Sequence, residues 1–460
     1  MASRGGPSTG CAGNDFTGDR TGYGVPPSCN YEANLRERSI DALRSLGAGR
    51  LLELLERVVS VPTVNPPGES YGEMAEVLQS EMEDAGYDVR VIEVPRDYLE
   101  KYIPRYADHP RYAVIARIGS GGPTVHFNSH YDVVPPGDGW TKDPFRLTVD
   151  GDAVYGRGVV DMKGGMATAM LAAQAAAIAG ADQFGSVELS FTPDEETGGE
   201  TGVKYLVESG EVSPDYVVVP EASGSDTVWI GNKGNLWADI EVRGRQAHGS
   251  TPWLGLNAFE GMARLALALS EDLQRRFSSR SSSYPFADPR EARPTVNVGG
   301  AVSGGAKVNV VPGFYSFTAD RRLIPEEGMD DAEAELRDAV DRAAAPLRSM
   351  GYGVDLRITS RSAPSVVSPD GKLARALSEA VRDATGSSPR LVVCPGGLDT
   401  RYFQLAGIEA LTYGPGDSSY AHAIDERNSL SEMMRVAGAY SVLIPSLLSP
   451  CDGQLPCSDP

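Results

Sequence analysis

The sequence of 460 residues is 41% hydrophobic and 23% charged, which is typical of a globular protein with roughly two or three domains. Its formal net charge of -21 argues against nucleic acid and anionic membranes as partners, because both carry negative charge. No apolar run is long enough to span a bilayer, and the first residues lack the apolar segment of a secretory signal, so we expect a cytoplasmic protein.

Both ends of the sequence are polar. Residues 1–32 are rich in Gly, Ser, Thr and Pro, so we predict an N-terminal extension there and a polar tail at 449–460. Apart from Cys394, the cysteines lie in these ends, and none has the paired spacing of a thiolate zinc site. We expect free thiols, with disulfides as the alternative, for Cys11, Cys29, Cys451 and Cys457.

The segment 33–233 alternates between helical and strand periodicity. Helices are predicted at 34–59 (interrupted by Gly47 and Gly49), 71–85, 162–181 and 204–209. Strands are predicted at 88–94, 112–118, 125–127, 154–155, 187–192 and 216–219. Alternation of this kind indicates a mostly parallel sheet with helices on its faces.

The segment 234–362 follows a different order, βαββαβ, which is typical of a two-layer, ferredoxin-like unit. Its predicted strands are 236–242, 295–302, 314–323 and 352–360, and its predicted helices are 258–273 and 330–347. The first pattern then resumes over 363–448, with helices at 371–384, 398–405 and 430–447 and strands at 391–393 and 410–413. We therefore predict an α/β protein whose catalytic domain, 33–233 and 363–448, is interrupted by an inserted domain, 234–362.

Polar residues that could carry chemistry follow the predicted strands. Ligands of a parallel sheet gather at the carboxyl ends of its strands, so these side chains are expected to lie close together. Imidazole and carboxylate are the ligands that zinc prefers where thiolate is absent. The candidates for a metal site are His130, Asp161, Glu195, Glu196, Glu221 and His422.

The adjacent Glu195 and Glu196 lie in the acidic loop PDEETGGE. In a tight loop, one of two neighbouring carboxylates can bind a metal while the other faces the attacking water. A hydrolase needs both, since the metal lowers the pKa of water and a free carboxylate takes its proton. The alternative is an acidic loop that is merely solvated.

Several motifs together resemble one family of two-zinc amidohydrolases and peptidases. They are the pair His130 and Asp132, the block GRGVVDMKG at 156–164, the triplet DEE at 194–196, and the late His422. That family contains acetylornithine deacetylase, succinyl-diaminopimelate desuccinylase, aminoacylase-1 and bacterial glutamate carboxypeptidase. The resemblance runs in order over residues 35–447 and includes the inserted segment.

The resemblance implies two zinc ions, for which cobalt or manganese can substitute. Asp161 would bridge the two ions. His130 and Glu221 would complete one site, and Glu196 and His422 would complete the other. Glutamate at position 221 resembles the deacylase members of the family more than the glutamate carboxypeptidases.

The resemblance also implies catalytic roles and a homodimer. Glu195 would be the general base, and Asp132 would hydrogen-bond the imidazole of His130. The segment GRQAHGS carries His248, which in relatives reaches into the active site of the partner subunit. There it would donate a hydrogen bond to the developing oxyanion. We therefore expect a homodimer formed through the inserted domain.

Substrate contacts follow from the same resemblance. Asn309 matches a substrate-binding asparagine, and Arg322 matches an arginine that binds the substrate carboxylate through two contacts. By strand alternation we expect the neighbouring Arg321 to face solvent. Gly396 and Gly397 match a glycine pair whose backbone approaches the substrate.

The predicted activity is hydrolysis of the amide bond of a small N-acyl amino acid, of the deacetylase or desuccinylase type, by a metal-activated water. One alternative is a carboxypeptidase or dipeptidase of the same family, acting on a short peptide. A second alternative is a non-catalytic relative that binds an amino-acid derivative, against which the complete set of candidate ligands argues. A third alternative is a site with one metal, or with another metal in the cell.

Overall fold

The computed structural model describes residues 27–448, with side chains from residue 33 onward. The predicted tail and most of the predicted extension lie outside the described residues, as do the side chains of Cys11, Cys29, Cys451 and Cys457. Cys394 is buried and is a free thiol. Across the described part, no helix has both the length and the apolar character needed to cross a membrane.

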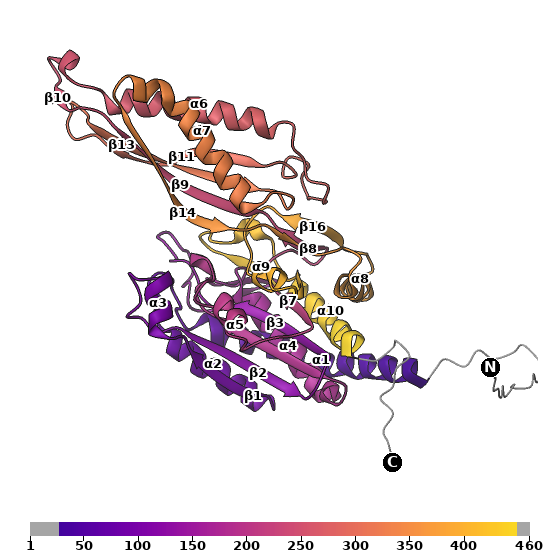
Figure 1. Cartoon of the computed structure of the whole chain (residues 1–460). Helices are drawn as coiled ribbons and strands as arrows, with labels where there is room; N and C mark the ends of the chain where they lie inside the picture. Colours follow the sequence, from indigo (N-terminus) through magenta and orange to yellow (C-terminus); the bar gives the residue numbers. More distant parts are fainter. Residues whose placement is uncertain (1–26, 449–460) are drawn as a thin grey trace, which may run out of the picture.

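The larger part of the described chain is built on a nine-stranded mixed sheet (Figure 1). In spatial order its strands are β1 (Asp88–Glu93), β2 (Tyr112–Gly119), β6 (Ser186–Thr192), β3 (Thr124–His130), β7 (Tyr216–Val219), β17 (Glu409–Thr412), β8 (Thr227–Asn232) and β15 (Ser365–Val366), with β16 (Arg390–Cys394) also paired to β8. The central strands β6, β3, β7 and β17 are parallel, as predicted, whereas β1 and β2 add antiparallel pairs at one side. The sequence patterns did not predict β8 and β15.

Helices cover both faces of this sheet. Five helices share the main core on one face: α1 (Pro27–Val59), α2 (Tyr71–Asp84), α4 (Lys163–Ala179), α8 (Lys372–Thr385) and α10 (Leu430–Leu448). Three shorter helices lie outside this group: α3 (Arg96–Tyr102), α5 (Val203–Glu208) and α9 (Thr400–Leu405). The helix α1 begins inside the predicted extension and is kinked at Gly47, where φ is 66°. A smaller core between the sheet and the helices α5 and α9 includes Phe403.

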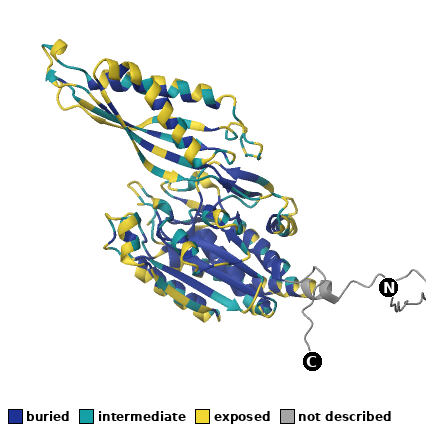
Figure 2. Cartoon of the chain, viewed as in Figure 1, coloured by how far each residue is buried: buried dark blue, intermediate teal, exposed yellow. Residues whose placement is uncertain are grey.

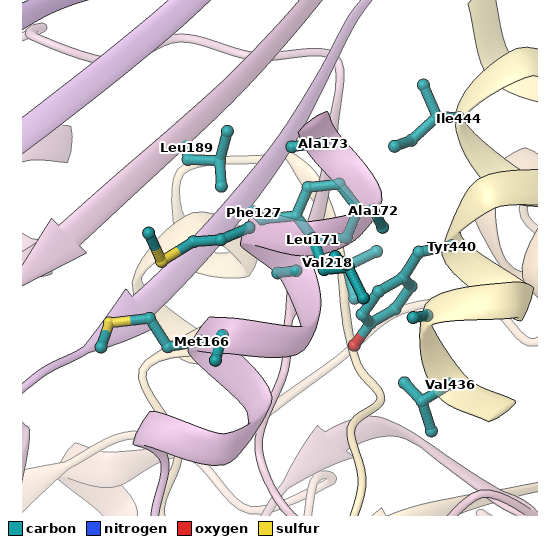
Figure 3. Close-up of a cluster of buried hydrophobic side chains, with 14 of the residues drawn as sticks. Phe127, Met166, Leu171, Ala172, Ala173, Leu189, Val218, Val436, Tyr440 and Ile444 are labelled. Carbon is teal, nitrogen blue, oxygen red and sulfur yellow. The ribbon is translucent and has the colours of Figure 1, made fainter. Parts of the chain in front are cut away.

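The Ala-rich sequence of α4 lets this helix pack tightly between the sheet and α10. Its small side chains leave room for large neighbours, and Phe127 of β3 meets Tyr440 of α10 edge to face at 4.9 Å between ring centroids (Figure 3). Met166 on α4 fills the same core. Burying each large apolar side chain contributes about 1.5–3 kcal/mol, so this core holds α4 firmly against the strand ends.

The inserted segment forms a four-stranded antiparallel sheet in the order β11, β13, β9, β14. Its strands are β9 (Gly234–Arg243), β11 (Thr295–Gly304), β13 (Phe314–Leu323) and β14 (Gly353–Ser362), and its helices are α6 (Ala258–Phe277) and α7 (Met329–Ser349). Both helices pack on one face of the sheet over an apolar core. The edge strand β11 is largely exposed (Figure 2). The predicted α/β class with a βαββαβ unit is confirmed.

Two short connections join the inserted segment to the larger sheet. Lys233 links β8 to β9, and Ala363 with Pro364 links β14 to β15. These connections touch, because a Cβ on Gly234 would lie 2.6 Å from Cδ of Pro364. Glycine is therefore required at the start of β9 for the two connections to run side by side.

The chain also forms a small three-stranded sheet. It consists of β4 (Thr148–Asp150), β5 (Ala153–Tyr155) and β18 (Arg427–Ser429). Strand β18 comes from the C-terminal part of the chain and pairs with β5, so the loops before α4 and before α10 lie next to each other.

Candidate metal centre

Three neighbouring parallel strands deliver acidic and histidine side chains to one edge of the sheet. His130 is the last residue of β3, which pairs in parallel with β6 on one side and β7 on the other. Strand β6 leads into the 3-10 turn η2 (Glu195–Thr197), and β7 leads directly through Pro220 to Glu221. Because these strands end together, their C-terminal side chains converge as predicted.

Asp161 and His422 come from the adjoining loops. Asp161 lies in the turn between β5 and α4, and a Cβ on Gly165 in the first turn of α4 would lie 1.8 Å from the carbonyl oxygen of Pro220. Only glycine lets the start of α4 approach the chain so closely beside Glu221. His422 follows the turn η4 (Ser418–Tyr420) with a left-handed backbone, φ 61°.

Within residues 33–448, these side chains form two groups of possible metal ligands that share Asp161. In one group, Nε2 of His130 lies 3.1 Å from Oδ1 of Asp161 and 3.2 Å from Oε1 of Glu221. In the other, Nε2 of His422 lies 3.1 Å from Oδ2 of Asp161 and 3.0 Å from Oε2 of Glu196. Asp161 therefore turns one carboxylate oxygen toward each group.

These separations fit tetrahedral coordination. Ligand atoms about 2.0–2.1 Å from a zinc ion lie roughly 3.3 Å from one another, close to the distances observed. Nδ1 of His130 lies 3.1 Å from the main-chain oxygen of Asp132, which favours a proton on Nδ1 and leaves Nε2 free as a ligand. The donor set present here can hold two divalent cations.

The local charge also favours cations. Burial raises the pKa of Glu195 well above its ordinary value, and the neighbouring Asp399 carboxyl raises it further. Burial, followed by the charge of Asp161, raises the pKa of Glu196 to about 7. Several carboxyl groups thus share a water-poor space with few positive charges, and a divalent cation would stabilise their ionised forms.

Glu195 belongs to neither of the two ligand groups found among the described residues. Its main-chain N–H donates to Oδ1 of Asp132 at 3.1 Å, and that of Glu196 donates to Oδ2 at 3.2 Å. The buried Asp132 carboxylate therefore holds the turn that presents both glutamates. Its distance to Nδ1 of His130 is longer, 3.4 Å, so its contact with this turn is at least as close as the predicted contact with the imidazole.

A buried ion pair supports the same turn, and sequence reasoning missed it. Asp194 has a left-handed backbone, φ 65°, and its Oδ2 accepts a hydrogen bond from Nε of Arg111 at 2.7 Å. Both side chains are 1% exposed. Tyr71 and Asn65 also donate to Oδ1 of Asp194, at 3.0 and 3.1 Å. The unusual backbone before Glu195 is thus held by several buried partners.

We expect Arg111→Met to lower the free energy of unfolding by about 3–5 kcal/mol, because it leaves the Asp194 carboxylate buried without its cation. Chemical denaturation followed by circular dichroism measures this change. Arg96→Met is the matched control, since Arg96 is paired with Asp108 but is 68% exposed. Equal effects of the two substitutions would contradict the prediction.

The structure does not bring His248 and Asn309 to the metal groups. Both lie at the end of the inserted segment farthest from the larger sheet, where β10 (Ala247–His248) pairs with β12 (Val310–Val311) (Figure 1). Both residues are exposed, and Nδ1 of His248 lies 2.7 Å from Oγ of Ser250. Within one chain, neither side chain is near the cluster around Asp161.

Arg322 lies near the opposite end of the inserted sheet, and the expectation for its neighbour is wrong. Arg322 is 30% exposed and contacts Asp320, whereas Arg321 is 1% exposed and lies 2.9 Å from Glu327. Successive side chains of β13 point to opposite faces of the sheet, and Phe317 lies on the face that packs under the helices. Arg321 shares that face, so it is the buried arginine of the two.

Gly396 and Gly397 lie in the loop after β16. A Cβ on Gly397 would meet no atom within 4 Å, and one on Gly396 would meet only Sγ of Cys394 at 3.6 Å. The backbone here therefore borders open space.

Burial raises the pKa of the Cys394 thiol to about 12, so this cysteine is unreactive at neutral pH.

Comparison with known proteins agrees with this geometry. The model of peptidase family M20/M25/M40 matches residues 126–445. The succinyl-diaminopimelate desuccinylase of Gluconobacter oxydans (strain 621H) is 35% identical over 306 residues, which cover 64% of this chain and 74% of that protein. The desuccinylase of Methylobacterium radiotolerans is 31% identical over 402 residues, covering 85% of this chain and 94% of that protein.

A solved structure shows the same fold. The di-peptidase Dug1p from Saccharomyces cerevisiae has a TM-score of 0.71 and 17% sequence identity, and the match covers 90% of this chain and 99% of that one. With the family match and the identity to the desuccinylases, the chain belongs to peptidase family M20/M25/M40. It is a metal-dependent hydrolase of amide bonds, and the resemblance read from its motifs is confirmed.

Proposed function

We propose that this enzyme removes an acyl group from an N-acyl amino acid, in the manner of a deacetylase or desuccinylase. The observation that carries the proposal is the pair of ligand groups sharing Asp161, which fits two cations beside an uncommitted Glu195 carboxyl. The two relatives described above, both named succinyl-diaminopimelate desuccinylase, support a deacylase over a peptidase.

The metals that we propose are two zinc ions, with cobalt or manganese as substitutes, held by His130, Asp161, Glu196, Glu221 and His422. When bound, they would polarise the amide carbonyl and lower the pKa of water. Glu195 accepts the proton of the attacking water and passes it to the leaving amine. Burial raises the pKa of Glu195, which suits this role, because a more basic carboxylate takes a proton from water more readily.

We propose a homodimer through the inserted domain, in which His248 and Asn309 act on the partner's metal centre. Strand β11 is an edge of its sheet and leaves backbone N–H and C=O groups unpaired on one side. Val302 on this strand and Val308 after it are exposed, as is Trp253 beside the tip that carries His248. An edge strand with exposed apolar side chains fits a second copy of the chain.

Arg322 is proposed to bind the free carboxylate of the substrate, with Gly396 and Gly397 lining the cleft. Arg322→Met should raise KM about 10- to 100-fold, since a hydrogen bond to a charged group contributes about 1.5–3 kcal/mol. Steady-state kinetics measure this change. Arg357→Met, on the same sheet and 76% exposed, is the control and should leave KM near wild type. A wild-type KM for Arg322→Met would remove Arg322 from the binding site.

The deciding experiment compares substrates with the purified full-length chain loaded with zinc or cobalt. N-acetyl and N-succinyl amino acids are tested against dipeptides and peptides with a free C-terminus. Faster turnover of an acyl amino acid supports the proposal. Faster turnover of dipeptides would make the enzyme a peptidase of the same family, and cleavage of neither set would overturn the assigned substrate class.

A further inference from the structure

A second buried ion pair joins the turn before Asp161 to the segment after His422. Nη1 of Arg157 lies 2.6 Å from Oε2 of Glu426, and both side chains are 1% exposed. Breaking a pair of this kind leaves an uncompensated charge in a water-poor space, which is strongly unfavourable. The two residues are separated by 269 positions, so the pair joins loops that are far apart in the chain.

The Glu426 carboxylate organises the turn that carries Asp161. Oε1 accepts hydrogen bonds from the main-chain N–H groups of Val160 at 2.8 Å and Asp161 at 3.2 Å. Oε2 accepts one from Gly158 at 3.1 Å. A single carboxylate thus satisfies successive backbone donors and fixes the direction from which the Asp161 side chain leaves the turn.

The Arg157 guanidinium organises the loop that carries His422. Nη1 donates to the main-chain oxygen of Ala423 at 3.3 Å, and Nη2 reaches that of His422 at 3.5 Å. Nη2 also donates to Pro136 at 3.2 Å, and the guanidinium lies over the ring of Trp140 at 5.0 Å. His422 is half exposed and has a left-handed backbone, so it depends on its loop more than the buried His130 does.

We propose that Arg157 and Glu426 are positioning residues that set the geometry between Asp161 and His422. Glu426 fixes the Asp161 turn, which serves both ligand groups. Arg157 ties that turn to the His422 loop, which serves only the group containing Glu196. This inference rests on the proposed two-metal site, and it assigns the two members of one ion pair different effects on the two ions.

The test is a zinc titration of metal-free, full-length protein in competition with a chromophoric chelator, which resolves two stepwise affinities. Arg157→Met should weaken one zinc ion about 10- to 100-fold, the usual effect of losing a residue that orients ligands, and leave the other within about threefold. Glu426→Gln should weaken both ions, because a side-chain amide cannot accept hydrogen bonds from donors on both sides. Arg157→Lys keeps the charge and should restore part of the lost affinity.

Arg321→Met is the matched control, since Arg321 is equally buried and paired with Glu327 and Glu335 in the inserted segment. It should lower thermal stability without changing either zinc affinity. Wild-type affinities in Arg157→Met, or losses matched by Arg321→Met, would overturn the inference. If Arg157→Met does not fold, the zinc affinities of Arg157→Lys and Glu426→Gln test the inference instead. A wild-type chain that binds fewer than two zinc ions would instead overturn the proposed two-metal function.

Discussion

Glu195→Gln is expected to lower kcat by about 100- to 10,000-fold, the usual contribution of a general base, while the protein still binds its metals. The substitution keeps the size of the side chain and removes only its ability to take a proton. Metal binding should persist because the ligand atoms come from other residues, namely His130, Asp161, Glu196, Glu221 and His422. The main-chain contact of residue 195 with Asp132 is also retained.

The measurement combines steady-state kinetics with metal analysis of the same preparation. Glu208→Gln on α5 is the control, because it removes a carboxylate of the same type that is 52% exposed and outside both ligand groups. Near-normal turnover by Glu195→Gln would exclude Glu195 as the base. Loss of metal from this variant would instead mean that Glu195 is itself a ligand.

His248→Ala is expected to lower kcat by about 100- to 1,000-fold, the cost of removing one donor to a developing oxyanion. In one chain His248 lies at the far end of the inserted segment, so the proposed partner must supply it (Figure 1). Mixing the Glu195→Gln and His248→Ala chains therefore tests the proposal. In a mixed dimer, one site would have both an intact Glu195 and an intact His248 from the other chain.

Random exchange of subunits makes about half of the dimers mixed, each with one working site, so about a quarter of wild-type activity should return. The readout is the activity of the mixture after subunit exchange, compared with each variant alone. If His248 acted within its own chain, the mixture would stay as inactive as its components. His109→Ala, in a loop outside both ligand groups, is the control for replacing a histidine and should keep wild-type activity.

The convergence of His130, Glu196 and Glu221 could be predicted because neighbouring parallel strands must end at the same edge of their sheet. The βαββαβ order could also be predicted, since each strand and helix there has strong periodicity. By contrast, β8 was missed because only the first four residues of its run TVWIGN favour a strand, and the Gly and Asn that follow are typical of a turn. The orientation of Arg321 was wrong because two adjacent arginines do not reveal the phase of a strand, which Phe317 sets here.

The supporting ion pairs could not be predicted for a different reason. Arg157 lies inside a recognised motif, but its partner Glu426 is distant in sequence and has no pattern of its own. Likewise, nothing in the sequence links Arg111 to Asp194. Local patterns report on single elements, whereas these contacts depend on how separate loops pack.

The two connections of the inserted segment touch at Gly234 and Pro364, and this has an evolutionary consequence. Asn232 and Ser365 face each other as antiparallel neighbours on β8 and β15, an arrangement that a hairpin of roughly two to five residues can close. The whole intervening unit is thus an excursion from one point of the larger sheet. A lineage could exchange this unit without changing the course of any other strand, so recognition of new substrates can change while the metal-ligand groups and Glu195 are inherited intact.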